Sequence, residues 1–459
     1  MIDIILSVFS TTCRELMYFS CVGFLIFAID ELVIDLIWIC STLWRKTFVY
    51  SKHRRATATT MPASRSPGEL AIFVPAWDES AVIGKMLHYA VTHFRHDNFT
   101  IFVGCYPNDP DTIKAVASVK HDAIRLVVCD SPGPTSKADC LNNLWRELER
   151  SVAHGAVFKA VILHDAEDLI SPDELAIFDR LIDNNALVQL PVVPLIDYTS
   201  RWVAGHYCDE FAEAHGKTLP VRERLGAGVP SAGVGCALRV EVLAEMSSEA
   251  SGPFNVDSLT EDYELGLRIH ELGYRTIFAS VPDNGKYGVV GTRAHFPNTL
   301  EAAVRQKTRW TIGIAIAGWD RVGWGHGPVE FWMRLRDRRA VMAAILITTA
   351  YLSVILACLL LLADTFGWSA ALEMSPTFGL VLRINAAFLI WRLVVRGYFV
   401  MRLYGWREGL MSVPRSVVAN AITIVSARRA VWQYLGVRTG KRLTWDKTDH
   451  IFPADPNAL

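Results

Sequence analysis

The chain has 459 residues, 51% of them hydrophobic, and a formal net charge of −1 at pH 7. This charge excludes the broadly basic surface of a nucleic-acid-binding protein, while the length allows a large soluble domain together with membrane segments. The nine cysteines are scattered and form no CxxC pair, which favours a reduced setting over a disulfide framework.

The first predicted element is the apolar segment 18–43, which is long enough to cross a bilayer, since about 20 residues suffice. We do not expect a cleaved signal peptide, because no basic start precedes this segment and no small-residue cleavage site follows it. Asp30, Glu31 and Asp35 are costly in lipid. Either these acids face other helices, or the span is short and its remainder lies at the interface.

Basic residues follow this segment and mark its cytoplasmic end. We therefore expect residues 1–55 to form a transmembrane segment with a basic flank. Residues 56–68, rich in Thr, Ser, Pro and Ala, are typical of a linker.

A soluble domain is predicted for residues 69–325. Buried strands are expected at 70–75, 100–105, 124–129 and 160–164, with a helical pattern at 81–94. Strands that alternate with helices favour an α/β fold with a mostly parallel sheet and helices on both faces. Ligands of such sheets bind beyond the carboxyl ends of the strands, where Asp109, Asp130 and Asp165 are expected.

The chain then returns to the membrane. Residues 326–410 are predicted to hold transmembrane helices, because 340–363 is an uncharged apolar run and 376–400 can return through the bilayer. Arginines flank both runs on the inner side. Residues 411–459 are expected to form an interfacial helix at 416–435, in preference to a further span, and a cytoplasmic tail.

An acidic turn follows the strand predicted at 160–164. Asp165 and Glu167 are two residues apart after a strand, so their carboxylates can converge on one divalent ion, Mg²⁺ or Mn²⁺. Asp168 is an alternative partner for Asp165. A solvated acidic turn before a helix is the other interpretation of this segment.

Two further polar blocks lie downstream. Residues 260–262, Thr-Glu-Asp, open a helical stretch, where Thr260 suits a helix cap and Asp262 a general base. Gln306, Arg309 and Trp310 are spaced to share one helical face. A guanidinium suits phosphate, although an amphipathic helix at a membrane surface would also use Arg and Trp.

Taken in order, these blocks resemble processive-type family 2 glycosyltransferases, the group of cellulose, chitin and hyaluronan synthases. The segment FVPAWDE at 73–79 resembles the opening of that domain. The segments HDAED at 164–168 and WDKTDHIFP at 445–453 more closely resemble one branch of this family, the bacterial phage-adsorption protein B-like inner-membrane glycosyltransferases. The resemblance implies a GT-A-like fold.

The resemblance also implies residue roles. Asp262 would be the catalytic base, with Glu261 beside it, and Asp165 and Glu167 would hold the metal. The nucleotide-sugar contacts would come from residues of four blocks: Glu79, Asp109, Lys137, Asp139, Gln306, Arg309 and Trp310. The glycine-rich segment 231–236 would line the acceptor side, and the segment 292–297 would cover the nucleotide.

These observations predict an inverting, multi-pass glycosyltransferase of the bacterial inner membrane with a cytoplasmic catalytic domain. Its donor would be a nucleotide-diphosphate sugar, a UDP-sugar, and its acceptor a growing polysaccharide or a lipid-linked sugar. An outer-membrane or secretion partner is expected, and no nucleic acid. The alternative is a non-catalytic membrane component of a polysaccharide secretion or phage-adsorption system that uses the same fold for assembly.

Overall fold

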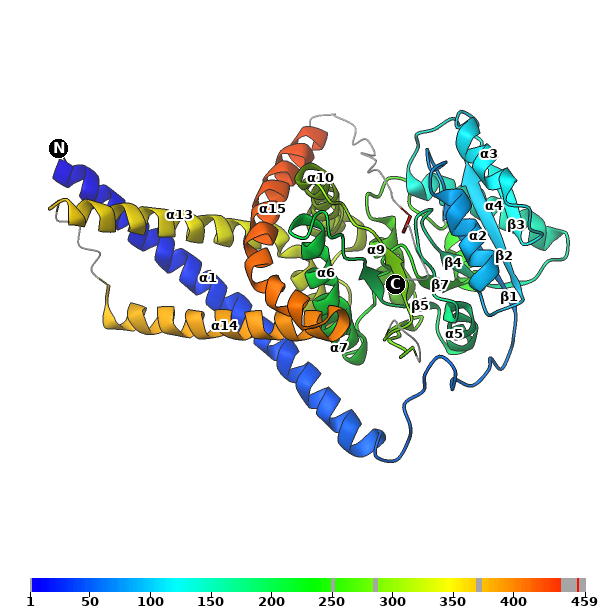
Figure 1. Ribbon diagram of the computed structural model, residues 1–459, viewed down its shortest axis with the longest axis horizontal. Helices are drawn as coiled ribbons and strands as arrows, with labels where there is room; N and C mark the ends of the chain where they lie inside the picture. The colour runs from blue at the N-terminus through cyan, green and yellow to red at the C-terminus, as the bar shows by residue number, and fades with distance from the viewer. Residues whose placement is uncertain (1, 249–251, 284–287, 369–373, 439–451, 454–459) are drawn as a thin grey trace.

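The computed structural model describes residues 2–248, 252–283, 288–368, 374–438 and 452–453. A seven-stranded sheet with strand order β3-β2-β1-β4-β7-β5-β8 forms the centre of the globular part (Figure 1). Its strands are β1 (Glu69–Pro75), β2 (Phe99–Cys105), β3 (Ile124–Val128), β4 (Phe158–Leu163), β5 (Leu187–Gln189), β7 (Cys236–Arg239) and β8 (Thr276–Phe278). Strand β7 runs antiparallel to β4 and β5, and the other neighbours pair in parallel. The predicted α/β fold is confirmed.

Helices cover both faces of this sheet: α2 (Ile83–His93), α3 (Pro110–Ser118) and α5 (Glu174–Leu181) on one face, and α4 (Lys137–Ala153), α8 (Val240–Ser248) and α9 (Glu261–Glu271) on the other. The other helices of the globular part are α6 (Val203–Glu213), α7 (Leu219–Arg224), α10 (Leu300–Trp310), α11 (Gly318–Val322) and α12 (Pro328–Arg338). A 3₁₀ turn, η2 (Ile182–Asn184), and two π-helical turns, η3 (Ala214–Thr218) and η4 (Thr311–Ile316), extend three of them. A second sheet pairs β6 (Val192–Pro194) with β9 (Thr292–Ala294) in parallel.

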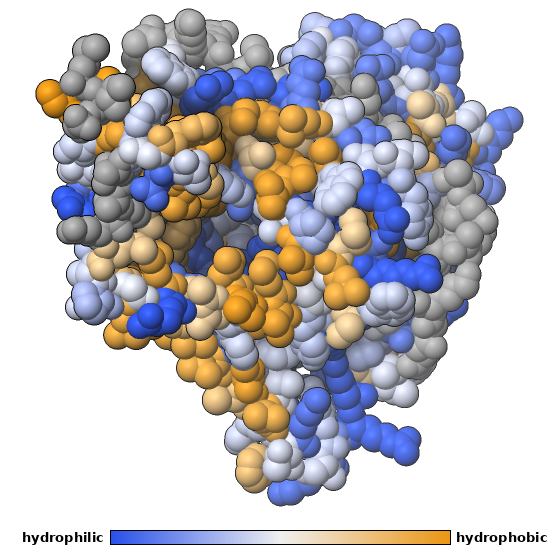
Figure 2. Space-filling model, turned by 60° about the vertical axis from the view of Figure 1, so that its left-hand side comes forward, coloured by the Kyte–Doolittle hydropathy of each residue, from blue (hydrophilic) through white to orange (hydrophobic). Residues whose placement is uncertain are grey.

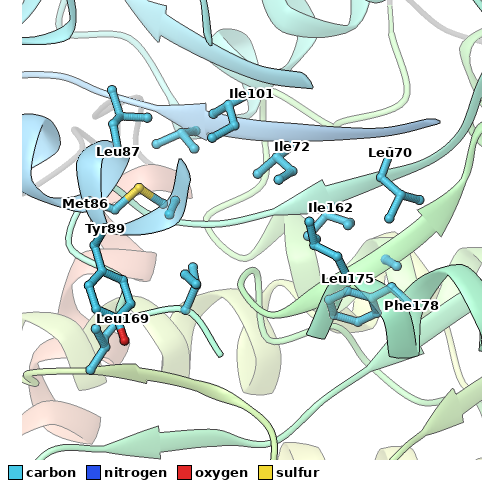
Figure 3. Packing of buried hydrophobic residues seen from close by; sticks show 14 of the residues in the cluster. Leu70, Ile72, Met86, Leu87, Tyr89, Ile101, Ile162, Leu169, Leu175 and Phe178 are labelled. Atoms are coloured by element: carbon cyan, nitrogen blue, oxygen red, sulfur yellow. The ribbon is translucent and has the colours of Figure 1, made fainter. Parts of the chain in front are cut away.

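The alternation of side chains along β1 explains why both faces are covered. Leu70 and Ile72 point into one apolar core with residues of α2, α3 and α5 (Figure 3). Ala71 and Phe73 point into the opposite core, formed with α4, α8 and α9. Successive side chains of a strand face opposite sides, so a strand buried on both sides must be apolar throughout. Phe452, from the far end of the chain, is also buried in the first core.

Four long helices lie beside this globular part: α1 (Ile2–Trp44), which continues into the π-helical turn η1 (Arg45–Val49), α13 (Ala340–Thr365), α14 (Pro376–Tyr404) and α15 (Trp406–Arg438). Within the described residues, α13, α14 and α15 are long and apolar enough to cross a membrane. Helices α1, α13 and α14 extend together away from the sheet (Figure 1), and hydrophobic residues gather on the face seen in Figure 2. The fold is therefore that of a membrane protein.

Three acidic residues of α1, Asp30, Glu31 and Asp35, face other helices, which answers the alternative left open by the sequence. Asp35 lies 2.6 Å from Lys217 of η3, and Glu31 lies 2.9 Å from Arg336 and 3.0 Å from Arg392. Asp30 pairs with Arg336 and Arg339. We call this cluster, together with Glu213 of α6 and Arg396 of α14, the membrane junction. These ion pairs link α1 and α14 to the globular part.

Helix α15 differs from the expected interfacial helix in its length, because it begins at Trp406 and passes through the predicted domain boundary at 410–411. In Figure 1 it runs across the direction of α13 and α14, between them and the sheet. Ile422 of α15 packs in one apolar cluster with Val304 of α10. The predicted tail lies outside the described residues, apart from positions 452 and 453.

Candidate active site

One pocket collects most of the predicted site residues. It opens at the carboxyl ends of β1 and β4 and is closed on its other side by α9 and α10. The predicted residues that line it are Glu79, Lys137, Asp165, Glu167, Glu261, Asp262, Gln306, Arg309 and Trp310. Blocks spread over more than two hundred residues therefore meet in one place, as the rule for open α/β sheets predicts.

The acidic turn after β4 lies against the N-terminus of α4. The Nζ atom of Lys137 lies 2.5 Å from an oxygen of Asp165 and 3.3 Å from the carbonyl oxygen of Gly233. Burial alone would lower the pKa of Lys137, but the charges of Asp165 and Glu261 raise it above its ordinary value. The lysine therefore stays charged beside the carboxylates.

The N-terminus of α9 presents two adjacent carboxyl groups to the same pocket. Burial and the neighbouring charge of Asp262 raise the pKa of Glu261 to about 7, and burial also raises the pKa of Asp262. An Oδ atom of Asp262 accepts a hydrogen bond of 2.8 Å from the backbone nitrogen of Tyr263. A carboxyl group with a raised pKa in a pocket suits a general base near neutral pH.

The segment 231–236 comes very close to this carboxylate. Gly233 has a φ of +76°, and a Cβ atom added there would lie 2.5 Å from Oδ2 of Asp262. Its neighbours Ala232 and Val234 line the pocket. Only glycine allows both this conformation and this approach.

Helix α10 carries the third group of side chains. The Nε atom of Arg309 and the Oε1 atom of Gln306 are buried and have no hydrogen-bond partner among the described residues. The ring of Trp310 lies beside those of Tyr207 and Phe211, with centroids 6.1 and 6.3 Å apart. Helix α10 therefore places the Arg309 cation, whose Nε–H group has no partner among the described residues, next to a group of aromatic rings.

Two predicted residues do not line the pocket. Asp109 caps α3, where it accepts hydrogen bonds from the backbone nitrogens of Thr112, at 3.3 Å, and of Asp78, at 2.6 Å. Asp139 lies in the first turn of α4, where its backbone nitrogen binds the Ser136 hydroxyl at 3.2 Å. Their contacts with a nucleotide stay predictions.

The expected capping role of Thr260 is only half correct. Thr260 occupies the N-cap position of α9, but its hydroxyl makes no capping bond. Gly313 of η4 approaches this residue closely, since a Cβ atom there would fall on the Thr260 hydroxyl. The start of α9 and the turn that follows α10 are thus packed against each other.

Sequence reasoning did not single out two residues of the pocket wall, Phe211 of α6 and Trp77 after β1. Phe296 also lines the pocket, and it belongs to the segment 292–297 that was expected to cover the nucleotide. Trp77 stands inside the FVPAWDE segment, which offered a signal for it. Phe211 carries no such signal, because α6 reaches the pocket through tertiary packing on β6, α14 and α15.

The residues present fit a hard divalent cation. Asp165 and Glu167 offer carboxylate oxygens at the pocket wall, and Mg²⁺ usually takes one or two carboxylates together with substrate phosphates. The described residues contain no group of three or more acidic, histidine or cysteine ligands. A cation held here would therefore depend on ligands from a bound diphosphate.

Comparison with known proteins agrees with this arrangement. The profile of a family described as "Glycosyltransferase like family 2" matches residues 67–313, more than half of the chain. "Bacteriophage adsorption protein B" of Escherichia coli (strain K12) and "Bacteriophage N4 adsorption protein B" of Escherichia coli O157:H7 are each 38% identical over 98% of the chain. The chain spans 62% of the length of these two relatives.

Among solved structures, a mannosyltransferase from Pyrobaculum calidifontis, in complex with GDP-Man and Mn²⁺, has a similar fold. It aligns over 93% of this chain and 99% of its own, with a TM-score of 0.55 and 15% sequence identity. At this identity the likeness concerns the fold alone. The fold and the branch predicted from the sequence are confirmed.

Proposed function

Because the chain belongs to glycosyltransferase like family 2, it is a glycosyltransferase, and we propose that it transfers a sugar from a nucleotide-diphosphate donor with inversion. The donor is a UDP-sugar, and the acceptor is a growing polysaccharide or a lipid-linked sugar. The observation that carries this proposal is the meeting of Asp165, Asp262 and Arg309 from three distant segments in one pocket.

Each group has a distinct task in this reaction. Asp165 and Glu167 hold a divalent cation, which neutralises the departing diphosphate when it is bound. Arg309 donates hydrogen bonds to the phosphates through its unused guanidinium nitrogen. Trp310 provides a flat apolar face for a sugar ring.

Asp262 acts as the general base. Its carboxylate takes the proton of the acceptor hydroxyl as that oxygen attacks the anomeric carbon of the donor. A single displacement of this kind inverts the anomeric configuration. The neighbouring Glu261 is the second acid of the block, and burial together with the charge of Asp262 raises its pKa.

The protein works at the bacterial inner membrane in this proposal, as a multi-pass protein with its catalytic domain in the cytoplasm. The three apolar helices support membrane insertion, and the arginines that flank them support the orientation. A polysaccharide made inside must leave the cell, so a secretion or outer-membrane partner completes the proposal.

The test is nucleotide release from a panel of UDP- and GDP-sugars by purified protein in detergent with Mg²⁺ or Mn²⁺. GDP-mannose and Mn²⁺ belong in the panel because the structurally similar mannosyltransferase carries them. We expect release from one donor, abolished by a chelator and by Asp165→Ala. Binding of nucleotide without release from any donor, even with acceptor sugars added, would favour the assembly-module alternative.

A further inference from the structure

We propose that His164 is a positioning residue, which holds the metal-binding turn in its working shape by bridging Asp168 and Glu174. This inference rests on the proposed function, because it concerns the metal ligands of the same site. His164 itself does not line the pocket, and its side chain is completely buried.

The bridge is a closed set of hydrogen bonds around the turn. The Nδ1 atom of His164 lies 3.0 Å from Oδ2 of Asp168, and its Nε2 atom lies 2.7 Å from Oε1 of Glu174. When both carboxyl groups are ionised, their oxygens can only accept hydrogen bonds, so both ring nitrogens donate in that state. The ring therefore ties the start of the turn to its middle and to the first residue of α5.

The same two carboxylates also accept hydrogen bonds from backbone nitrogens of the turn. Oδ2 of Asp168 accepts a hydrogen bond of 2.9 Å from the backbone nitrogen of Asp165, and Oε2 of Glu174 accepts one of 3.1 Å from that of Ser171. Asp165 and Glu167 are therefore enclosed in a turn with a fixed backbone. Fixed ligand orientation is what such outer contacts provide at metal sites.

This arrangement also assigns the second acid of the pair. Oδ2 of Asp168 is committed to both His164 and the backbone of Asp165. Asp168 thus shapes the turn, and Glu167 is left as the partner of Asp165 at the cation. The longer arm of a glutamate is compatible with this role because the backbone under it is held in place.

The far side of the turn is fastened as well. Leu169 and Arg293 exchange two backbone hydrogen bonds of 2.7 and 3.0 Å. Arg293 belongs to β9, which leads into the segment of Phe296 in the pocket wall. A fully buried histidine with two buried carboxylates is a costly way to fill a core, since apolar residues of similar volume often serve equally well. Its place under the metal ligands supplies a reason for it.

The experiment compares two near-isosteric variants of the full chain in detergent. The amide nitrogen of Asn takes the position of Nδ1, and that of Gln the position of Nε2. His164→Asn therefore keeps a donor toward Asp168, whereas His164→Gln keeps one toward Glu174. Retention of Mn²⁺ is measured by electron paramagnetic resonance in the presence of UDP or GDP, with Asp165→Ala as the background.

We expect His164→Gln, which loses the bond to Asp168, to bind Mn²⁺ at least tenfold more weakly than the unaltered protein. His164→Asn loses only the bond to Glu174, and we expect its Mn²⁺ affinity to lie within threefold of that of the unaltered protein. Each variant loses one hydrogen bond, so a purely structural role would weaken both to the same degree. His206→Gln removes another buried histidine, outside the metal-binding turn, and is expected to leave Mn²⁺ binding unchanged.

Equal Mn²⁺ affinity in the two His164 variants would overturn the proposal, as would Mn²⁺ retention that does not depend on Asp165. If neither variant folds, Asp168→Glu takes their place, because it keeps the charge and displaces the carboxylate. That variant is expected to lose at least tenfold in Mn²⁺ affinity, and unchanged affinity would again overturn the proposal. Failure of the proposed function would look different: Mn²⁺ would be retained through Asp165, and no sugar nucleotide would be consumed.

Discussion

Two groups of buried carboxylates in this protein are treated in opposite ways. At the membrane junction, Asp35 and Glu213 share Lys217 at 2.6 and 2.9 Å, and five basic side chains surround four acids: Asp30, Glu31, Asp35 and Glu213 among Lys217, Arg336, Arg339, Arg392 and Arg396. In the pocket, burial raises the pKa of Glu261 and Asp262. Basic side chains of the protein surround the acids of the junction, whereas the pocket leaves two carboxyl groups with raised pKa values, which favour their protonated forms.

The largest expected effect comes from the base. Asp262→Asn keeps the shape of the side chain but removes its ability to accept a proton. We expect sugar transfer to fall by about 10²- to 10⁴-fold, while metal-dependent nucleotide binding persists. The measurement pairs a transfer assay with nucleotide binding on the same preparation, and normal transfer would remove Asp262 from this role.

Two lysines paired with carboxylates give the second contrast: Lys217, which is fully buried, and Lys137, whose side chain is 20% exposed. Lys217→Met leaves Asp35 and Glu213 without their shared cation, and we expect about 3–5 kcal/mol of destabilisation. Unfolding in detergent, followed with and without Mn²⁺, measures it, and Mn²⁺ is expected to leave the difference between Lys217→Met and the unaltered protein unchanged, because the pocket is intact in both.

Lys137→Met is the matched variant in the pocket. It leaves Asp165 without its lysine, but a divalent cation can take over the same carboxylate. We therefore expect a loss of stability that Mn²⁺ restores. The comparison fails if Mn²⁺ narrows the loss of stability relative to the unaltered protein for both lysine variants or for neither of them.

Two glycine substitutions test the close approach of Gly233 to Asp262. Gly233→Ala places a methyl group against Asp262, and we expect transfer to fall by roughly 10- to 100-fold, because small displacements of reacting groups are costly. Gly226 has nearly the same φ, +78°, but a Cβ atom there meets nothing within 4 Å. Gly226→Ala should therefore share the conformational cost, about 1–2 kcal/mol, and keep full activity.

The smallest expected effect is a pH dependence of stability. The pKa of Glu261 is raised in the folded state to about 7 from an ordinary value near 4.5. Stability from this group is fully present below about pH 4.5 and is lost as the pH rises through about 7. The unfolding midpoint of the unaltered protein should therefore fall across this window relative to that of Glu261→Gln. Parallel curves for the two proteins would show that Glu261 titrates normally.

The sequence predicted the sheet and most of the site because both depend on local patterns. Apolar runs predicted β1, β2, β3 and β4 within two residues. For β1, β2 and β4 this follows because strands buried on both faces must be apolar throughout. The expectation that β3 is also buried is wrong, because β3 lies at the edge of the sheet and most of its side chains are exposed. The spacing of Gln306, Arg309 and Trp310 predicted one helical face, and the pocket contains all three. Their chemical roles stay predictions.

What the sequence did not predict depends on contacts between distant segments. The partners of Asp30, Glu31 and Asp35 come from residues some 180 to 360 positions away, and no local pattern pairs them. The same holds for Phe211, which reaches the pocket from α6. Asp109 shows a second limit. An aspartate suits both a helix cap and a contact with a ligand, so the residue type alone does not distinguish the two roles.

The packing of α10 on α15 has a consequence for how the protein is purified and assayed. Arg309 and Trp310 stand on a helix that rests on α15 and not on the central sheet. The lipid or detergent around α15 thereby becomes part of the environment that sets the width of the substrate cleft. Turnover should vary with acyl-chain length at constant secondary structure, so a preparation that is well folded by circular dichroism can still be kinetically altered.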